Sequence, residues 1–106
     1  SILHLTTNWE PKKMTAYVSV HATVNDPEKQ QEYGAAAGPI VESHGGKIVC
    51  RGPAETLHGE SAHQIMVVLE FSDKQSAIDW YNSADYQAII PTRDAAMDSV
   101  FILGGE

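Results

Sequence analysis

Hydrophobic and polar residues alternate along residues 16–24 (AYVSVHATV), a pattern that predicts a β-strand with two different faces. One face carries the alanines and valines of this run. The other carries Tyr17, Ser19 and His21, which are polar but uncharged. A polar face without charges indicates that another surface lies against it rather than open water.

The next segment changes to helical spacing, with apolar residues recurring between Tyr33 and Val41. Asp26 is a favourable N-cap and Pro27 suits the first helical position. Pro39 lies inside this pattern and is expected to kink the helix, because it removes a backbone donor. The glycine pair at residues 45–46 is expected to end it.

Two further strands follow, joined by a predicted hairpin arm. Residues 47–51 (KIVCR) form a short strand, residues 54–62 the arm, and residues 63–71 (HQIMVVLEF) the most apolar strand of the chain. In this last strand Met66, Val68 and Glu70 share one face, because side chains alternate along a strand.

A second helical region is expected to begin near Asp73, since Ser72 and Gln75 have the spacing of a capping box. Breaks are expected at residues 82–83 and before Pro91, giving two or three helical pieces. Residues 99–103 (SVFIL) form the closing strand. The order strand, helix, strand, strand, helix, strand predicts an α+β fold of the ferredoxin-like βαββαβ type, with a four-stranded antiparallel sheet.

Helices then cover one face of the sheet and leave the other bare. The apolar residues Phe101, Leu103, Met66 and Val68 are expected on the bare face. Such a patch would be unusual on a monomer, so the sequence predicts a homodimer formed by two bare sheet faces.

The composition adds no element to this picture, but it argues against several classes of protein. The chain has 106 residues and a net charge of −7, which suits one domain and disfavours nucleic acid as a partner. No apolar run is long enough to span a membrane. Cys50 is the only cysteine, and we expect it to be buried in a cytoplasmic protein. Residues 1–13 lack a clear period and are expected to be an N-terminal extension, either not native or a native surface arm. The domain then spans residues 14–106.

Several stretches together resemble a known family. The segments AYVSVHATVNDPEKQQEY, GPIVESHGGKIVCRG, VVLEFSD and WYNSADYQAIIPTRDAA are similar to the domain of unknown function thirteen-thirty family of dimeric α+β barrels. The resemblance covers residues 14–104 and implies the fold without an established chemistry. His58 and His63 depart from the family pattern, which usually has a glutamate before the hairpin glycine and a basic residue at the start of the third strand. Related barrels include cofactor-free monooxygenases and lactone isomerases.

One candidate site lies on the polar face of the first strand. His21 could approach Glu70, because the first and third strands of this topology are neighbours. A carboxylate that orients a histidine would make it a general base. The alternative is a polar pair whose members satisfy one another at a dimer interface. We expect a cleft between sheet and helices to collect Tyr17, His21, Glu70 and Arg93.

A second candidate combines aromatic rings with a fixed positive charge. Trp80, Tyr81, Tyr86 and Arg93 would suit a flat organic acid. The alternative is that the rings pack in the core and Arg93 pairs with a carboxylate such as Asp85, Glu70 or Asp94.

Metal and cofactor sites have weaker support. His58 and His63 flank a predicted turn near Glu55 and Glu60, but their spacing matches no strong zinc signature. No phosphate loop or nucleotide fingerprint is present. The sequence therefore predicts no metal and no cofactor. It leaves open a cofactor-free enzyme of monooxygenase or isomerase type acting on a small organic molecule, and a non-catalytic dimeric binding or assembly module.

Overall fold

The computed structural model describes residues 15–106, so the predicted extension at residues 1–13 lies outside the described residues. The elements are β1 (Ala16–Val24), α2 (Pro27–Ser43), β2 (Lys47–Pro53), β3 (Ile65–Phe71), α3 (Lys74–Asn82), α4 (Ala84–Ala96) and β4 (Met97–Gly105). Their order confirms the predicted α+β ferredoxin-like fold.

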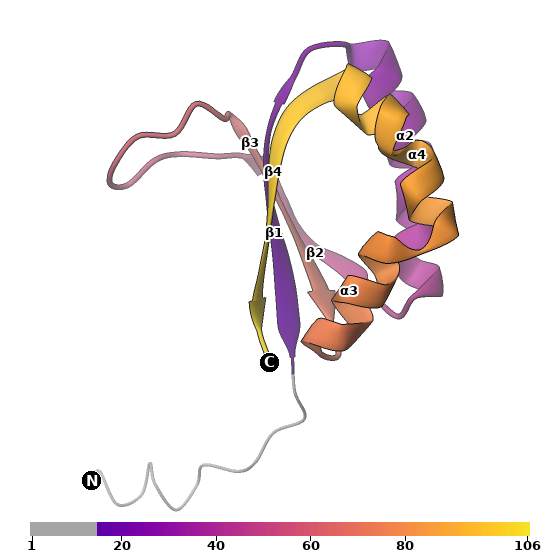
Figure 1. Cartoon of the computed structure of the whole chain (residues 1–106). Helices are drawn as coiled ribbons and strands as arrows, with labels where there is room; N and C mark the ends of the chain where they lie inside the picture. Colours follow the sequence, from indigo (N-terminus) through magenta and orange to yellow (C-terminus); the bar gives the residue numbers. More distant parts are fainter. Residues whose placement is uncertain (1–14) are drawn as a thin grey trace, which may run out of the picture.

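The four strands form one antiparallel sheet in the order β2-β3-β1-β4. All the helices lie on the same side of this sheet (Figure 1). We call that side the covered face; it carries Val18, Val20, Leu69, Phe71, Phe101 and Leu103. The opposite, uncovered face carries Tyr17, Ser19, His21, Met66, Val68, Glu70, Val100 and Ile102. The segment between β2 and β3 projects away on the uncovered side (Figure 1).

The helix boundaries follow from local hydrogen bonding. The Asp26 carboxylate accepts from the backbone N–H groups of Glu28 and Lys29, as predicted for the start of α2. At α3 the cap is Asp73, one residue after the predicted Ser72, because its carboxylate accepts from the N–H of Ser76 at 2.7 Å. The predicted break between α3 and α4 falls at Ser83. The predicted break before Pro91 is wrong, since α4 continues through it.

The placement of β4 corrects one sequence expectation. Phe101 pairs with Val20 and Leu103 pairs with Val18, so both lie on the covered face rather than the uncovered one. Val100 and Ile102 take the uncovered positions on β4, with β1 between them and Val68, and are 45% and 55% exposed. The run VFIL is apolar on both faces and has no alternation that would fix its orientation.

The core lies between the covered face and the helices. Trp80, Tyr86 and Phe71 are its largest fully buried side chains. Their rings are in contact, with the Trp80 and Tyr86 centroids 4.6 Å apart and those of Phe71 and Trp80 5.3 Å apart. Cys50, expected to be buried, is exposed because β2 is an edge strand. None of the helices within residues 15–106 is long and apolar enough to cross a membrane.

Candidate functional site

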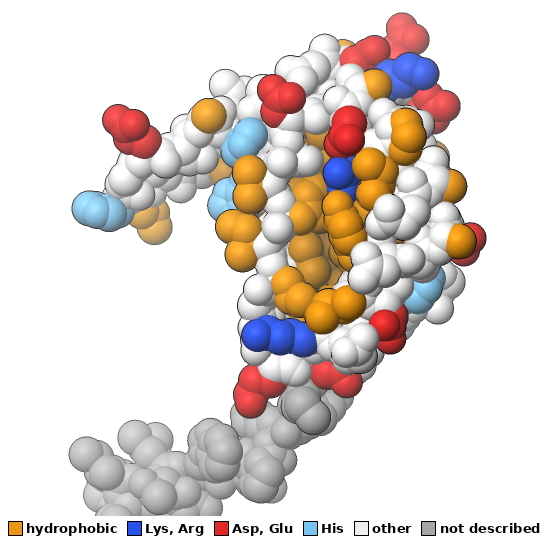
Figure 2. Space-filling view, in the orientation of Figure 1, with side chains coloured by type: hydrophobic (Ala, Val, Ile, Leu, Met, Phe, Trp, Pro, Cys, Tyr) orange, Lys and Arg blue, Asp and Glu red, His pale blue; other side chains and the backbone are white. Residues whose placement is uncertain are grey.

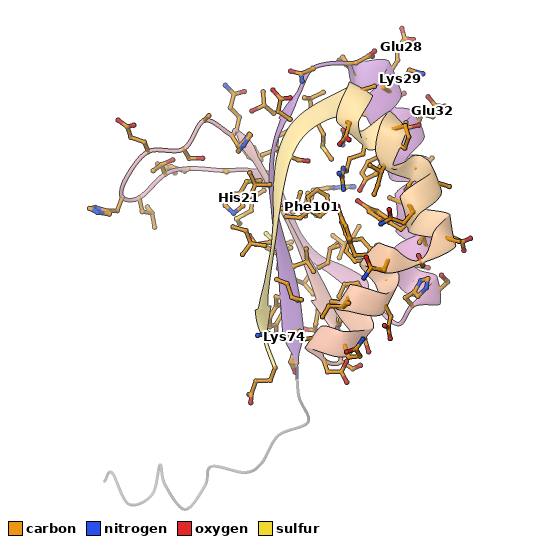
Figure 3. The ribbon with its side chains drawn as sticks, viewed as in Figure 1. His21, Glu28, Lys29, Glu32, Lys74 and Phe101 are labelled. Carbon is orange, nitrogen blue, oxygen red and sulfur yellow. The ribbon has the colours of Figure 1, made fainter. Side chains whose placement is uncertain are left out.

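A cleft opens between the covered face and the helices. α2 packs mainly on α4 and stands off the sheet, which leaves a mostly apolar chamber of about 110 Å³. Val20, Tyr33, Val67, Trp80, Met97 and Phe101 are among the residues that line it. Figure 2 shows the hollow between sheet and helices, lined by hydrophobic side chains with a basic group at its upper end. Phe101 projects into the space between sheet and helices (Figure 3).

Two glycines of α2 help to leave the chamber open. Gly34 and Gly38 lie one helical turn apart and both line the chamber. A Cβ atom at either position would meet no heavy atom within 4 Å. Glycine inside a helix costs about 1 kcal/mol relative to alanine, and close packing does not require it here. The space in front of these two glycines is therefore unfilled at a cost in helix stability.

Arg93 stands beside the chamber. It lines a neighbouring shallower hollow that shares Met97 and Phe101 with the chamber and also includes Tyr81 and His63. Its side chain is only 12% exposed. The guanidinium carbon lies 5.0 Å from the Phe101 ring centroid, within cation–π range. A cation is therefore held at the edge of an apolar cavity.

The donors of Arg93 are only partly used. Nη1 donates to the Tyr81 hydroxyl at 2.9 Å and to the Tyr86 hydroxyl at 3.3 Å. Nε donates to the Asp94 carboxylate at 3.1 Å, and that carboxylate is 63% exposed. Among residues 15–106, Nη2 has no protein acceptor. Burial alone would lower the pKa of Arg93, but the bonds to Tyr81, Tyr86 and Asp94 raise it above its usual value. The side chain is thus a permanent cation with donors to spare.

A pair of buried phenols continues this network. The hydroxyls of Tyr33 and Tyr86 are 2.7 Å apart. Burial, and then the proximity of Tyr86, raise the pKa of Tyr33 well above its usual range. Burial also raises the pKa of Tyr86, partly offset because Tyr33 and Arg93 can donate hydrogen bonds to its ionised oxygen. Both phenols therefore keep their protons at neutral pH and act as hydrogen-bond donors, not as bases.

Two other polar atoms near the chamber have no partner. Trp80 Nε1 and Gln30 Oε1 are buried without a hydrogen bond among the described residues, and both side chains line the chamber. Buried polar atoms are nearly always paired in folded proteins. Because these two atoms are unpaired, packing within the protein does not by itself account for their positions beside the chamber.

His63 lies at the same shallow hollow as Arg93. The Thr23 hydroxyl donates to the Ala62 carbonyl at 3.2 Å and lies 3.1 Å from His63 Nδ1. A hydroxyl has one hydrogen, so Nδ1–H must be the donor to Thr23. In neutral His63 this leaves Nε2 without a proton and able to accept one.

The predicted pairing of His21 with Glu70 is wrong in its geometry. His21 lies opposite Met66 and Glu70 lies opposite Tyr17, four residues away along β3. The His21 ring instead meets the Ser19 hydroxyl at 3.0 Å, and Glu70 pairs with Lys47 at 3.5 Å. All of these side chains lie on the uncovered face, where Figure 3 shows His21 turned away from the helices.

The expected cleft of Tyr17, His21, Glu70 and Arg93 therefore does not form, since only Arg93 lies between sheet and helices. The structure does bring together the second predicted group, which consists of Trp80, Tyr81, Tyr86 and Arg93. The pairing of Arg93 with Asp94, one of the alternatives, is also present. Sequence reasoning placed Tyr33 only in an apolar stripe and missed its role in the network. Within residues 15–106, no three His, Cys, Asp or Glu side chains come together as potential metal ligands.

The fold and this cleft define an α+β ferredoxin-like protein with an apolar cavity between its sheet and its helices. The family model described as Domain of unknown function (DUF1330) matches residues 15–105, and the chain belongs to that family. A search of curated proteins gives no match.

Solved structures agree on the fold. A protein of unknown function from Rhodopseudomonas palustris is 19% identical, with a TM-score of 0.73 over 97% of this chain and 88% of its own. SnoaB from Streptomyces nogalater, a cofactor-independent oxygenase, is 12% identical, with a TM-score of 0.62 over 88% and 92%. A dimeric ferredoxin-like protein of unknown function from Thermobifida fusca is 14% identical, with a TM-score of 0.62 over 93% and 97%. At these identities the likeness concerns the fold alone.

Proposed function

We propose that this protein binds a small organic acid in the cleft between the covered face and the helices. The carboxylate lies against Arg93 and the non-polar body lies in the chamber. The observation that carries this proposal is Arg93 itself, a cation 12% exposed at the rim of an apolar cavity, with Nη2 unused among the described residues.

Charge and solvation support a carboxylate at this place. A buried charge is costly unless paired, and the Asp94 partner is largely exposed, so water weakens that pair. An anion in the hollow would meet free guanidinium donors in a less polar environment, where charge-assisted hydrogen bonds are strong. Arg51 also lines the chamber, but it is an exposed residue of the edge strand β2. Arg93 is therefore the better anchor.

The chamber favours a body of about one ring. Its volume of about 110 Å³ is somewhat below the cavity of about 150 Å³ that accepts benzene, and it adjoins the hollow at Arg93. Gly34 and Gly38 leave open space at their own positions on its α2 wall. These features suit a compact aromatic or branched acid rather than a long chain.

The test compares an acid with its neutral counterpart by titration calorimetry. We expect 4-ethylbenzoate to bind the parent protein and 4-ethylbenzamide to bind at least about tenfold more weakly, since hydrogen bonds to charged groups contribute about 1.5–3 kcal/mol. Arg93→Met should remove that preference, while Arg51→Met, the matched control, should keep it. Melting curves check that both variants are folded. No binding to the parent, or loss of the preference in Arg51→Met alone, contradicts the proposal.

Separate observations support catalysis on the acid bound in this cleft. SnoaB is a cofactor-independent oxygenase with the same fold, and His63 at the Arg93 hollow presents an unprotonated Nε2 in its neutral form. In this form Nε2 takes a proton from the carbon next to a keto group of the bound acid, and the electron pair of that C–H bond passes to the keto oxygen as an enolate. We expect faster deuterium exchange of the methylene group of phenylpyruvate, followed by NMR. His63→Gln should lose the acceleration and keep the binding; unchanged exchange with the parent protein contradicts catalysis of this type.

The uncovered face supports assembly of two copies through this surface. Val100 and Ile102 on β4 are 45% and 55% exposed, and Met66 and Val68 on β3 are half-buried, with Ser19 and His21 of β1 between the two pairs. Exposed apolar side chains of this kind mark an interaction site, and a second copy offers the same surface. The Thermobifida fusca structure with this fold is itself dimeric. Sedimentation of the parent protein as a monomer at micromolar concentration would contradict this part of the proposal.

A further inference from the structure

The hydroxyl protons of the cleft can be assigned by counting donors and acceptors. Arg93 carries only donors, so the Tyr86 oxygen accepts from Nη1 at 3.3 Å. Tyr86 and Tyr33 then share one hydrogen bond of 2.7 Å, in which either could be the donor. Each phenol has a single proton. One of the two protons is therefore used between them, and the other has no acceptor among residues 15–106.

Burial decides which phenol keeps the unused proton. If Tyr33 donated, the free proton would belong to Tyr86, which is 0% exposed and does not line the chamber. If Tyr86 donates, the free proton belongs to Tyr33, which is 8% exposed and lines the chamber. An unsatisfied buried donor costs about 1–3 kcal/mol, so the second arrangement is favoured because a ligand or water can accept there. The bonds then run in one direction, from Arg93 to Tyr86 to Tyr33.

We infer that Tyr33 O–H is a donor for an oxygen on the ligand, so that the cleft selects acids carrying a second acceptor, of the oxo-acid class. This inference rests on the proposed binding of a carboxylate at Arg93. Two successive hydrogen bonds of 3.3 and 2.7 Å join Arg93, Tyr86 and Tyr33, which keeps the two contact points within the length of a one-ring molecule. The carboxylate meets Arg93, the ring lies in the chamber, and the carbonyl oxygen accepts from Tyr33.

The successive hydrogen bonds from Arg93 to Tyr86 and from Tyr86 to Tyr33 also explain why Tyr33 would be an effective donor. A hydroxyl that accepts a hydrogen bond becomes more polarised, and donation from Tyr86 acts on Tyr33 in this way. Tyr86 is in turn polarised by the cation of Arg93. Because the phenols stay protonated, Tyr33 can stabilise negative charge that builds up on a carbonyl oxygen, as donors in an oxyanion hole do.

The experiment uses two acids of similar size, 4-acetylbenzoate and 4-ethylbenzoate, with the full chain. We expect the parent protein to bind the acetyl compound about five- to tenfold more tightly, the value of one hydrogen bond. Tyr33→Phe should make the two affinities equal. Tyr17→Phe, which removes an exposed phenol on the uncovered face, should keep the difference. A merely structural effect of Tyr33→Phe would weaken both acids together and leave their ratio unchanged.

Infrared spectroscopy of the parent protein supplies a measurement that needs no variant. The carbonyl stretch of bound 4-acetylbenzoate should shift to lower frequency than in water-free solvent, because Tyr33 donates to it. Equal binding of the two acids by the parent protein, with Arg93 still required, overturns the inference and leaves the carboxylate site standing. Binding of neither acid overturns both. An acetyl preference that survives in Tyr33→Phe assigns the donor elsewhere and also overturns the inference.

Discussion

The two faces of the sheet carry similar side chains in very different surroundings. On the covered face Leu69 and Phe71 are 5% and 1% exposed, whereas on the uncovered face Val100 and Ile102 are 45% and 55% exposed. Residues on the two faces of the sheet thus divide between a packed interior and an open surface, and side chains alternate between these faces along each strand. The difference shows that strand parity decides which residues can reach the cleft.

The polar residues divide in the same way. Arg93 and the buried phenols gather above the covered face, where they are joined by short hydrogen bonds. Ser19, His21 and Glu70 lie on the uncovered face, where Ser19 meets His21 and Glu70 pairs with Lys47. A small-molecule site is therefore proposed for the first region and an interface between copies for the second. Each prediction below tests one side of this contrast.

The largest effect is expected in the core under the helices. Trp80→Ala should lower the free energy of unfolding by about 3–5 kcal/mol, because it empties the space of a side chain that is 1% exposed. Ile78→Ala on the same helix, where the side chain is 40% exposed, should change it by about 0.5 kcal/mol or less. Urea titrations at one fixed protein concentration measure both. Similar losses in the two variants would mean that the ring cluster is not the core.

On the uncovered face, Ile102→Asp should convert the proposed dimer to monomer at micromolar concentration. A buried carboxylate without a partner costs several kcal/mol in an interface. Ile78→Asp, at a similarly exposed position on α3, is the matched control and should leave the assembly intact. Sedimentation velocity distinguishes the two states. A dimer that persists in Ile102→Asp would move the interface to another surface.

High pH should lower the free energy of unfolding through the buried phenol pair above the covered face. The pKa of Tyr33 is raised above the usual tyrosine value of 10.0, so the protonated form is favoured in the folded state. Its contribution is complete below pH 10 and falls as pH rises above it, by up to about 1.4 kcal/mol per pH unit. Thermal melting between neutral pH and pH 11 should show a steeper decline for the parent than for Tyr33→Phe. Equal declines in melting temperature for the two proteins would show that Tyr33 ionises as readily in the folded state as in the unfolded state.

The smallest effect is a gain in stability. Gly34→Ala should raise the free energy of unfolding by about 0.5–1 kcal/mol, since alanine is the better helix former and the new methyl group meets no atom within 4 Å. The same methyl group enters the chamber, so affinity for 4-ethylbenzoate should fall. Gln31→Ala, at an exposed position of α2, is the control and should leave affinity unchanged. Higher stability with unaltered affinity would show that the ligand does not reach this wall.

Short-range patterns predicted much of the fold. Alternation in residues 16–24 identified β1, Asp26 marked the start of α2, and Ser83 marked the break between α3 and α4. The grouping of Trp80, Tyr81, Tyr86 and Arg93 followed from their closeness in the chain, because helical spacing brings such residues to one side. Tyr33 could not be added in this way, since it comes from α2 and meets Tyr86 only through the packing of α2 on α4.

The sequence by itself thus determined the element order, the two-faced character of β1 and the presence of a cation among aromatic rings. These features depend on backbone periods of two residues in strands and 3.6 in helices, which act over a few residues. The tertiary structure alone decided that Glu70 lies opposite Tyr17 and not His21, and that Phe101 faces the helices while Ile102 does not. Long-range pairing sets the register of a strand, and it also decides which residues of a uniformly apolar run face the core. A shift of one residue moves every side chain to the opposite face of the sheet.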